Sequence, residues 1–103
     1  MSISGAMNIS LSGIQAQTRK VSAAANNIAN VTTPGYSRLE TQSTSILTGG
    51  VSTAVTQSTA NSNVDLASEM IDIIGAEISF KANAAAFETG ADIWDVLMTI
   101  KRD

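Results

Sequence analysis

Large apolar residues recur every seven positions through the C-terminal third of the chain. This spacing is typical of an amphipathic helix that packs in a coiled coil, and it predicts one helix of about 40 residues unless Gly75 or Gly90 bends it. Such a helix spans about 55 Å, whereas a compact domain of about 100 residues has a radius of gyration near 13 Å. We therefore expect the 103-residue chain to be a rod. The repeat consists of Leu66, Ile73, Phe80, Phe87 and Trp94.

A second stripe of the same period lies in the N-terminal segment, and it predicts a second helix. Together the two stripes predict an all-α dominated, elongated protein in which the N- and C-terminal helices pair as an antiparallel coiled coil. One seam between two helices leaves much apolar surface uncovered unless other copies cover it. The second stripe consists of Met7, Ile14, Val21 and Ile28, and the residues expected to stay partly exposed are Ile71, Ile74, Ile78 and Ile93.

The first helix is expected to end at Asn30, because asparagine tolerates the left-handed conformation that often closes a helix. Pro34 and Gly35 suit the central positions of a type II turn. This account leaves Asn26 and Asn27 unexplained, since asparagine is a mediocre helix former unless it caps or bonds across an interface. A hydrogen bond across an interface is the interpretation that remains for these two residues.

Between the helices the chain is mainly Ser, Thr, Asn, Gln and Gly. Alternation at Val51, Thr53 and Val55, together with Gly49-Gly50, predicts a hairpin between residues near 41–47 and 51–57. The low hydrophobicity indicates that this segment alone would be a mobile loop or a marginal ribbon, so we expect an exposed structure that depends on a partner. The expected organisation is a helix with its exit turn (1–36), a polar insert (37–63) and a long helix (64–103).

Four acids on the second helix have two interpretations each. Asp65, Glu69 and Asp72 share a face, where they either serve the helix dipole in solvent or hold a metal ion; the first is favoured, and Asp65 or Asn63 is expected to cap the helix. Glu77 lies within the apolar stripe and either reaches outward or pairs with Arg19 or Lys20.

Composition argues against most site chemistry. The chain contains no cysteine and no histidine, so the commonest metal ligand and general base is missing, and we expect neither a catalytic site nor a cofactor. Bases exceed acids in residues 1–64 and acids exceed bases in residues 65–103, for a total of −3. No basic face is indicated, so nucleic acid is not an expected partner. Neither a membrane span nor a cleavable secretory signal is predicted.

Two segments resemble the signatures of the flagellar axial proteins, which are the rod, hook and hook-associated subunits. "NNIANVTTPGYSR" (26–38) resembles their N-terminal signature, and "NVDLASEMIDIIGAEISFKANAAAFETGADIWDVLMTIKR" (63–102) resembles their C-terminal signature. Within these segments the resemblance singles out Asn27, Asn30, Pro34, Gly35 and Tyr36 at the exit from the first helix, and Phe80, Asn83 and Thr89 on the second. The signature residues expected at contacts between subunits are Asn26, Asn27, Asn30, Pro34, Gly35, Tyr36 and Asn83.

The resemblance implies a structural subunit of the bacterial flagellum. In that family the terminal helices form the inner tube of the axis, subunits assemble helically with copies of themselves and with other rod and hook subunits, and the chains leave through the type III export apparatus without a cleaved signal. Because about 27 residues separate the two signatures here, a small subunit of the basal-body rod, in the periplasmic space, is favoured over a hook protein.

The segment 63–102 departs from the family pattern at three places. Glu77-Ile78 replaces the usual Gln-Arg, Phe80 replaces a tyrosine and Gly90 replaces an alanine. One alternative is a small helical adaptor that regulates flagellar assembly, and an enzyme that cuts the cell wall is disfavoured by the missing site chemistry.

Overall fold

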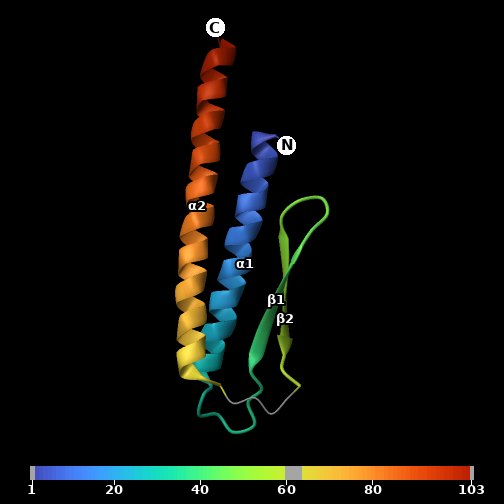
Figure 1. Ribbon diagram of the computed structural model, residues 1–103, viewed down its shortest axis with the longest axis vertical. Coiled ribbons are helices and arrows are strands. Elements are labelled where there is room, and N and C mark those ends of the chain that lie inside the picture. The colour runs from blue at the N-terminus through green and yellow to red at the C-terminus, as the bar shows by residue number, and fades with distance from the viewer. Residues whose placement is uncertain (1, 60–63, 103) are drawn as a thin grey trace.

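The computed structural model describes residues 2–59 and 64–102, and it is a rod. Its extents are 66 × 25 × 14 Å and its radius of gyration is 17.8 Å, well above the value of about 13 Å for a compact domain of this length. The elements in chain order are α1 (Ile3–Ala29), β1 (Leu39–Ser45), β2 (Val51–Gln57) and α2 (Leu66–Arg102) (Figure 1). The elongated, mainly helical fold is as predicted.

Helix α2 runs for 37 residues without interruption at Gly75 or Gly90. Asp65 caps its start: the carboxylate accepts hydrogen bonds from the Ala67 N–H and the Ser68 hydroxyl, both at 3.1 Å. Asn63, the other predicted cap, lies outside the described residues. The seven-residue repeat therefore predicted both the type and the length of this element.

Helix α1 starts at the Ser2 cap, whose hydroxyl accepts the Gly5 N–H at 2.9 Å. It ends before Asn30 as predicted, although Asn30 has φ −107° and is not left-handed. The predicted turn follows: Gly35 has φ 74° and the Tyr36 N–H donates to the Thr33 carbonyl at 3.3 Å. These values fit a type II turn.

The polar insert forms an antiparallel hairpin, so of the two expectations the hairpin is confirmed. Its register pairs Leu39 with Gln57 at one end and Ser45 with Val51 at the other. β1 begins two residues before the predicted strand. The chain reverses at Gly49 and Gly50, where φ is 107° and 92°, a conformation that side chains with a Cβ rarely adopt.

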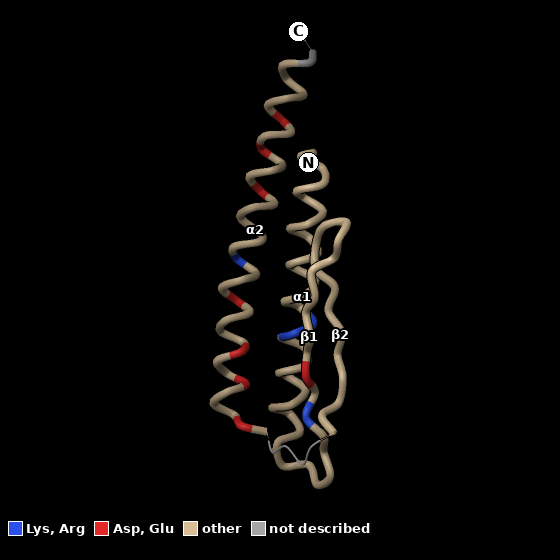
Figure 2. Tube along the Cα trace, turned by 45° about the vertical axis from the view of Figure 1, so that its right-hand side comes forward, with Lys and Arg blue, Asp and Glu red and all other residues tan. Residues whose placement is uncertain are grey.

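Helix α1 lies between α2 and the hairpin (Figures 1 and 2). The two helices run antiparallel, so both chain ends lie at the same end of the rod, and α2 continues past the start of α1 (Figure 1). No helix within the described residues has the length and apolarity that a membrane crossing requires. The fold thus consists of three elements side by side, α2, α1 and the hairpin, with α1 in the middle.

The tightest contacts between the helices involve small residues. The buried apolar side chains among the described residues are Ala16, Ala23, Ala24 and Ala76. A Cβ on Gly13 would lie 2.6 Å from the Asn83 side chain, and one on Gly90 would lie 2.7 Å from Met7. Small residues at these positions let the two backbones approach closely.

The large apolar residues of the two stripes flank this seam and are only partly covered. Val21 is 37% exposed, Phe80 42%, Leu66 45% and Trp94 48%. The other five, which are half-buried, are Met7, Ile14, Ile28, Ile73 and Phe87. On α2 the line that meets α1 lies three residues further along, at Glu69, Ala76, Asn83 and Gly90.

Candidate functional site

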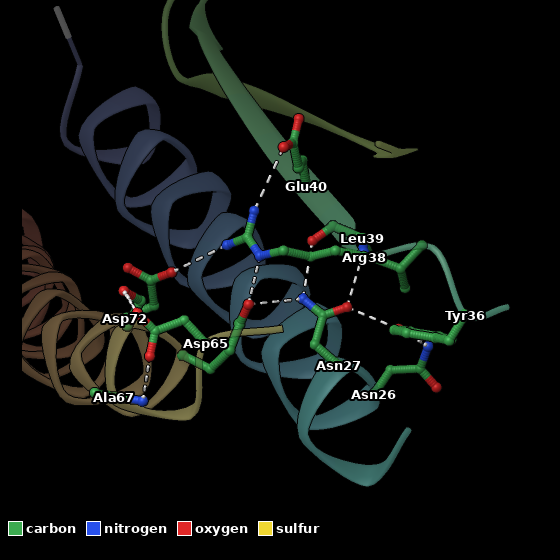
Figure 3. A network of polar contacts seen from close by, with 11 residues as sticks. Asn26, Asn27, Tyr36, Arg38, Leu39, Glu40, Asp65, Ala67 and Asp72 are labelled. Atoms are coloured by element: carbon green, nitrogen blue, oxygen red, sulfur yellow. Dashed lines mark hydrogen bonds and ion pairs between the residues drawn. The ribbon is translucent and has the colours of Figure 1, made fainter. Parts of the chain in front are cut away.

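A polar network joins α1, the hairpin and α2 (Figure 3). It lies at the end of the rod opposite the two chain ends, which we call the base of the rod (Figure 1). Asn27 comes from the last turns of α1, Tyr36 and Arg38 from the exit segment, Leu39 from the start of β1, and Glu69 from the first turn of α2. Residues that are far apart in the sequence therefore meet where the chain leaves one element for the next.

Asn27 is the centre of the network. Its side chain, 1% exposed, donates to the Leu39 carbonyl at 2.9 Å and to Glu69 Oε1 at 3.1 Å. Its amide oxygen accepts the Leu39 N–H at 2.8 Å and the Tyr36 hydroxyl at 2.7 Å. An amide has two donor hydrogens and two acceptor positions, so this buried side chain is fully satisfied within the chain.

Glu69 is a buried acid, 1% exposed, and Arg38 is its charged partner. Arg38 Nε donates to Glu69 Oε1 at 2.5 Å. Its other nitrogens lie 3.5 Å from Glu40 and 3.7 Å from Asp72, whose side chains are more exposed. A buried carboxylate is tolerated only when it is paired and hydrogen-bonded, and here one oxygen receives bonds from both Arg38 and Asn27.

The hydrogen bond to Glu69 raises the pKa of Arg38 above its ordinary value, an effect that burial of the guanidinium partly opposes. Charge attraction from Glu69, Glu40 and Asp72 acts in the same direction as the hydrogen bond. Arg38 is therefore charged at neutral pH.

A second set of bonds holds the exit turn against the end of α1. The Asn26 amide donates to the Tyr36 hydroxyl at 3.0 Å. The Asn30 amide donates back to the Asn26 carbonyl at 2.9 Å, and its oxygen accepts the Thr33 hydroxyl at 3.1 Å. The three asparagines thus fix the direction in which the chain leaves the helix.

The bonds of Asn27 lie within the subunit, and a contact of this residue with neighbouring subunits stays a prediction. All four of its hydrogen-bonding positions are occupied within the subunit, because the hairpin folds back over α1. Asn26 is exposed. Its amide has the single described partner Tyr36, so an intersubunit role for Asn26 stays a prediction.

The acids Asp65, Glu69 and Asp72 do not form one cluster. Asp65 caps α2, Glu69 bonds Arg38 and Asn27, and Asp72 lies 3.7 Å from another nitrogen of the Arg38 guanidinium. Residues 2–59 and 64–102 contain no group of three or more side chains placed to hold a metal ion together. The expectation that all three acids stay in solvent is wrong for Glu69, which faces α1.

Glu77 does not pair with Arg19 or Lys20 in the described structure. It reaches outward and lies 3.0 Å from Lys81 on the next turn of α2, so of the two interpretations the outward one is correct. Arg19 instead donates to the Thr53 carbonyl at 2.7 Å. Its position toward the hairpin could not be read from the helical stripes.

The predicted signature residues take different positions. Pro34 and Gly35 form an exposed turn, while Tyr36 reaches back to both Asn26 and Asn27. Asn83 lies apart from the network, on the seam opposite Gly13, and its amide donates to the Ser79 carbonyl at 3.0 Å. The described contacts of Asn83, like those of Asn27, therefore lie within the subunit.

Sequence reasoning gave no role to Arg38 or Gly13 and took Glu69 for a solvated acid. A signal for Glu69 does exist. It lies seven residues before Ala76 and in register with Asn83 and Gly90, so a search for a line of small and polar residues would have placed it on the seam. Arg38 follows no such period, because it lies outside both helices.

Comparisons with known proteins match both ends of the chain. Residues 7–36 match the family model for the flagella basal body rod protein. Residues 55–100 match the model for the C-terminal region of the flagellar basal body rod FlgEFG proteins. Asn27 and Tyr36 lie in the first match and Glu69 in the second, while Arg38 and Leu39 lie between them.

Curated relatives are flagellar hook proteins. The chain is 47% identical over 41 residues to the flagellar hook protein FlgE of Brucella suis. This alignment covers 40% of this chain and 10% of that protein. It is 39% identical over 64 residues to the FlgE of Rhizobium meliloti, covering 53% of this chain and 16% of that protein. The matches thus span between a tenth and a sixth of these relatives. With one model on its first helix and exit turn and the other on its second helix, the chain belongs to the flagellar axial protein family.

Proposed function

We propose that this chain is a structural subunit of the flagellar basal-body rod that polymerises through its terminal helices. The observation that carries the proposal is the exposed apolar surface of α2. Ile71 is 67% exposed, Ile78 65%, Val96 59% and Ile100 65%. A single chain seldom leaves so many large apolar side chains along one helix uncovered, and contiguous exposed apolar surface marks interaction sites.

Helical assembly is the form of polymer that such a surface favours. The exposed residues lie along one helix at one side of the rod. If this surface meets a different surface of the next copy, the contact gives an open filament when it does not close into a ring. The partners are then further copies of the chain and the adjoining rod and hook subunits.

The rod is favoured over the hook because the segment between the two family matches contains little besides one hairpin. Residues 37–54 hold β1, the turn and the start of β2, which is too little for an outer domain. The relatives that bear the name hook protein match only over 10 to 16% of their length. A hook location is the contrary outcome.

Export through the flagellar type III apparatus, followed by assembly in the periplasm, completes the proposal. A reporter fusion tests it: deletion of residues 2–10 is expected to abolish secretion by a flagellated cell. Deletion of residues 41–55, which removes most of the hairpin, is the control and should leave secretion intact. Unchanged secretion after the first deletion would count against an export role for the N-terminal segment.

Sedimentation and circular dichroism over a concentration series test polymerisation. We expect the average mass and the helix content to rise together with concentration. A helical monomer at all concentrations would contradict the proposal and favour the second candidate, a small adaptor in flagellar assembly. That candidate has one observation in its support, which is that Asn27 and Glu69 are satisfied within a single chain.

Location is tested by immunogold labelling of hook and basal-body particles that carry an epitope between Gly49 and Gly50. These two residues lie in the turn that joins β1 to β2. Gold over the rod is the expected result. Gold along the hook would retain the axial role and overturn the assignment to the rod.

A further inference from the structure

The hairpin rests on α1 through polar side chains that bond its backbone. The Ser12 hydroxyl accepts the Val51 N–H at 3.0 Å, and Arg19 donates to the Thr53 carbonyl at 2.7 Å. At the base, Asn27 holds both backbone groups of Leu39. These anchors are spaced along one side of α1, from its first half to its last turn.

The register explains why these backbone groups are available. The Ser58 N–H bonds the Arg38 carbonyl and the Ile46 N–H bonds the Gly50 carbonyl, and in an antiparallel pair the bonded positions alternate. The N–H and C=O groups of Val51 and Thr53 therefore point to the outer edge of β2. Ser12 and Arg19 therefore bond backbone groups at the outer edge of β2.

Open grooves run along the contact between the hairpin and α1. One, of about 620 Å³, is lined by Ala23 and Ala25 of α1 and by Leu39 and Val55 of the hairpin. A second, of about 150 Å³, lies next to Ser12 and Val51. Thr53 is the buried residue of the described strands, whereas Val55 is 44% exposed. Apolar packing thus adds little to the polar anchors.

The strength of attachment changes along the hairpin. At the base, Asn27 and Glu69 are 1% exposed and are held by charged and neutral hydrogen bonds. Further along, Arg19 is an exposed residue with one described bond to the hairpin. The bonds of Ser12 and Arg19 to the hairpin are single and part-buried, and each contributes about 1–3 kcal/mol. Several bonds converge on the more deeply buried Asn27 and Glu69, so the far anchors open more easily than the base.

We propose that the β1–β2 hairpin is a hinged arm. Its base is fixed by Asn27, Arg38 and Glu69, and its far part swings away from α1 when the bonds of Ser12 and Arg19 open, while α1 and α2 remain paired. Neither strand packs on α2, so this motion leaves the helix seam intact. The inference concerns the single chain and holds whether or not the chain polymerises.

Pulsed electron paramagnetic resonance measures this motion directly, because the chain contains no native cysteine. Spin labels at Asn8→Cys on α1 and Leu47→Cys near the hairpin tip report on the arm. Labels at Thr18→Cys and Lys81→Cys, whose native side chains line one groove between α1 and α2, report on the helix pair. The measurement uses the full chain.

Arg19→Ala is expected to add a population of longer distances for the arm labels and to leave the helix labels unchanged. The matched control is Lys20→Ala, because Lys20 is the neighbouring exposed base and makes no described hydrogen bond to the hairpin. An unchanged arm distance in Arg19→Ala would overturn the proposal. Broadening of both label pairs would overturn it too, since the hairpin would then not move as a separate arm.

Hydrogen exchange provides a second readout that does not depend on labels. In Ser12→Ala the Val51 amide should exchange about fivefold to tenfold faster, the size expected for one net hydrogen bond. The Leu39 amide, held by Asn27 at the base, should keep its rate. Equal acceleration of both amides would show that the hairpin detaches as a whole, which contradicts a hinge at its base.

Discussion

The side chain of Asn27 bonds the backbone of Leu39 as a neighbouring strand would. The amide donates to the Leu39 carbonyl at 2.9 Å and accepts the Leu39 N–H at 2.8 Å. Because Leu39 is the first residue of β1, these two bonds fix the start of the hairpin to the end of α1. Asn27 therefore determines where the chain turns back, and its contribution is to the folding of the subunit.

Asn27→Asp tests this role with little change in size. Aspartate keeps the acceptor for the Leu39 N–H but removes both donors and places a charge beside the buried carboxylate of Glu69. We expect a loss of about 3 kcal/mol in the free energy of unfolding, measured by urea denaturation. Asn26→Asp is the control and should cost less than about 1 kcal/mol, because Asn26 is exposed. Similar losses in both variants would refute a special role for Asn27.

Gly13→Ala and Gly75→Ala are expected to change stability in opposite directions. At Gly13 a Cβ meets the Asn83 side chain at 2.6 Å, whereas at Gly75 nothing lies within 4 Å. Alanine favours a helix by about 1 kcal/mol over glycine, but overpacking costs about 1–3 kcal/mol. Thermal denaturation should show a lower melting temperature for Gly13→Ala and a higher one for Gly75→Ala.

The same substitution in an Asn83→Ala background identifies the contact responsible. With the Asn83 amide removed, Gly13→Ala should become neutral or stabilising, because the added methyl group then has room. A loss that persists in this background would mean that the methyl group clashes elsewhere on the seam.

Arg38→Met removes the charged partner of Glu69 and leaves a carboxylate that is 1% exposed. A cost of about 3 kcal/mol is expected, because loss of one partner strands a buried charge. Arg38→Lys should recover part of the loss, since lysine keeps the charge but not the fork of donors. Recovery by Arg38→Met combined with Glu69→Gln would confirm that the stranded charge is the cause.

The pH dependence of this pair follows from the pKa of Arg38. That pKa is raised in the folded state, chiefly by the hydrogen bond to Glu69. A raised pKa gives stability that is complete below the unfolded value and is lost only as the pH rises through the folded value. The contribution of Arg38 to the free energy of unfolding should therefore stay constant from neutral pH to the highest pH at which unfolding can be measured. A decline of this contribution near pH 9 would contradict the prediction.

The helices and the exit turn could be predicted from the sequence because each has a local signal, and the hairpin was one of two structures that the signals of the insert allowed. The seven-residue repeats define α1 and α2, and Pro34-Gly35 and Gly49-Gly50 supply the backbone conformations that the two turns need. In these cases local preference and final structure agree.

The interior of the rod could not be predicted in the same way. Large apolar residues define the stripe, but the helices approach each other most closely where side chains are small, at Gly13 and Ala76. Burial of Asn27 and Glu69 depends on a hairpin docked from elsewhere in the chain, and no periodicity within one helix reports such a contact.

Ile78→Glu separates assembly from folding. Ile78 is 65% exposed on α2, so a polar replacement should change the stability of the single chain by no more than about 0.5 kcal/mol. In the proposed polymer this side chain is covered, and a charge there loses apolar burial worth about 1.5–3 kcal/mol. Sedimentation equilibrium should therefore show association weakened about tenfold or more, with an unchanged helical spectrum under conditions where both proteins are fully folded.

Thr44→Glu adds the same charge at an exposed position of β1 and should leave the association constant within about twofold of the parent, because β1 lies across α1 from the apolar surface of α2. Equal association of all three proteins would mean that copies of the chain do not meet through this part of α2.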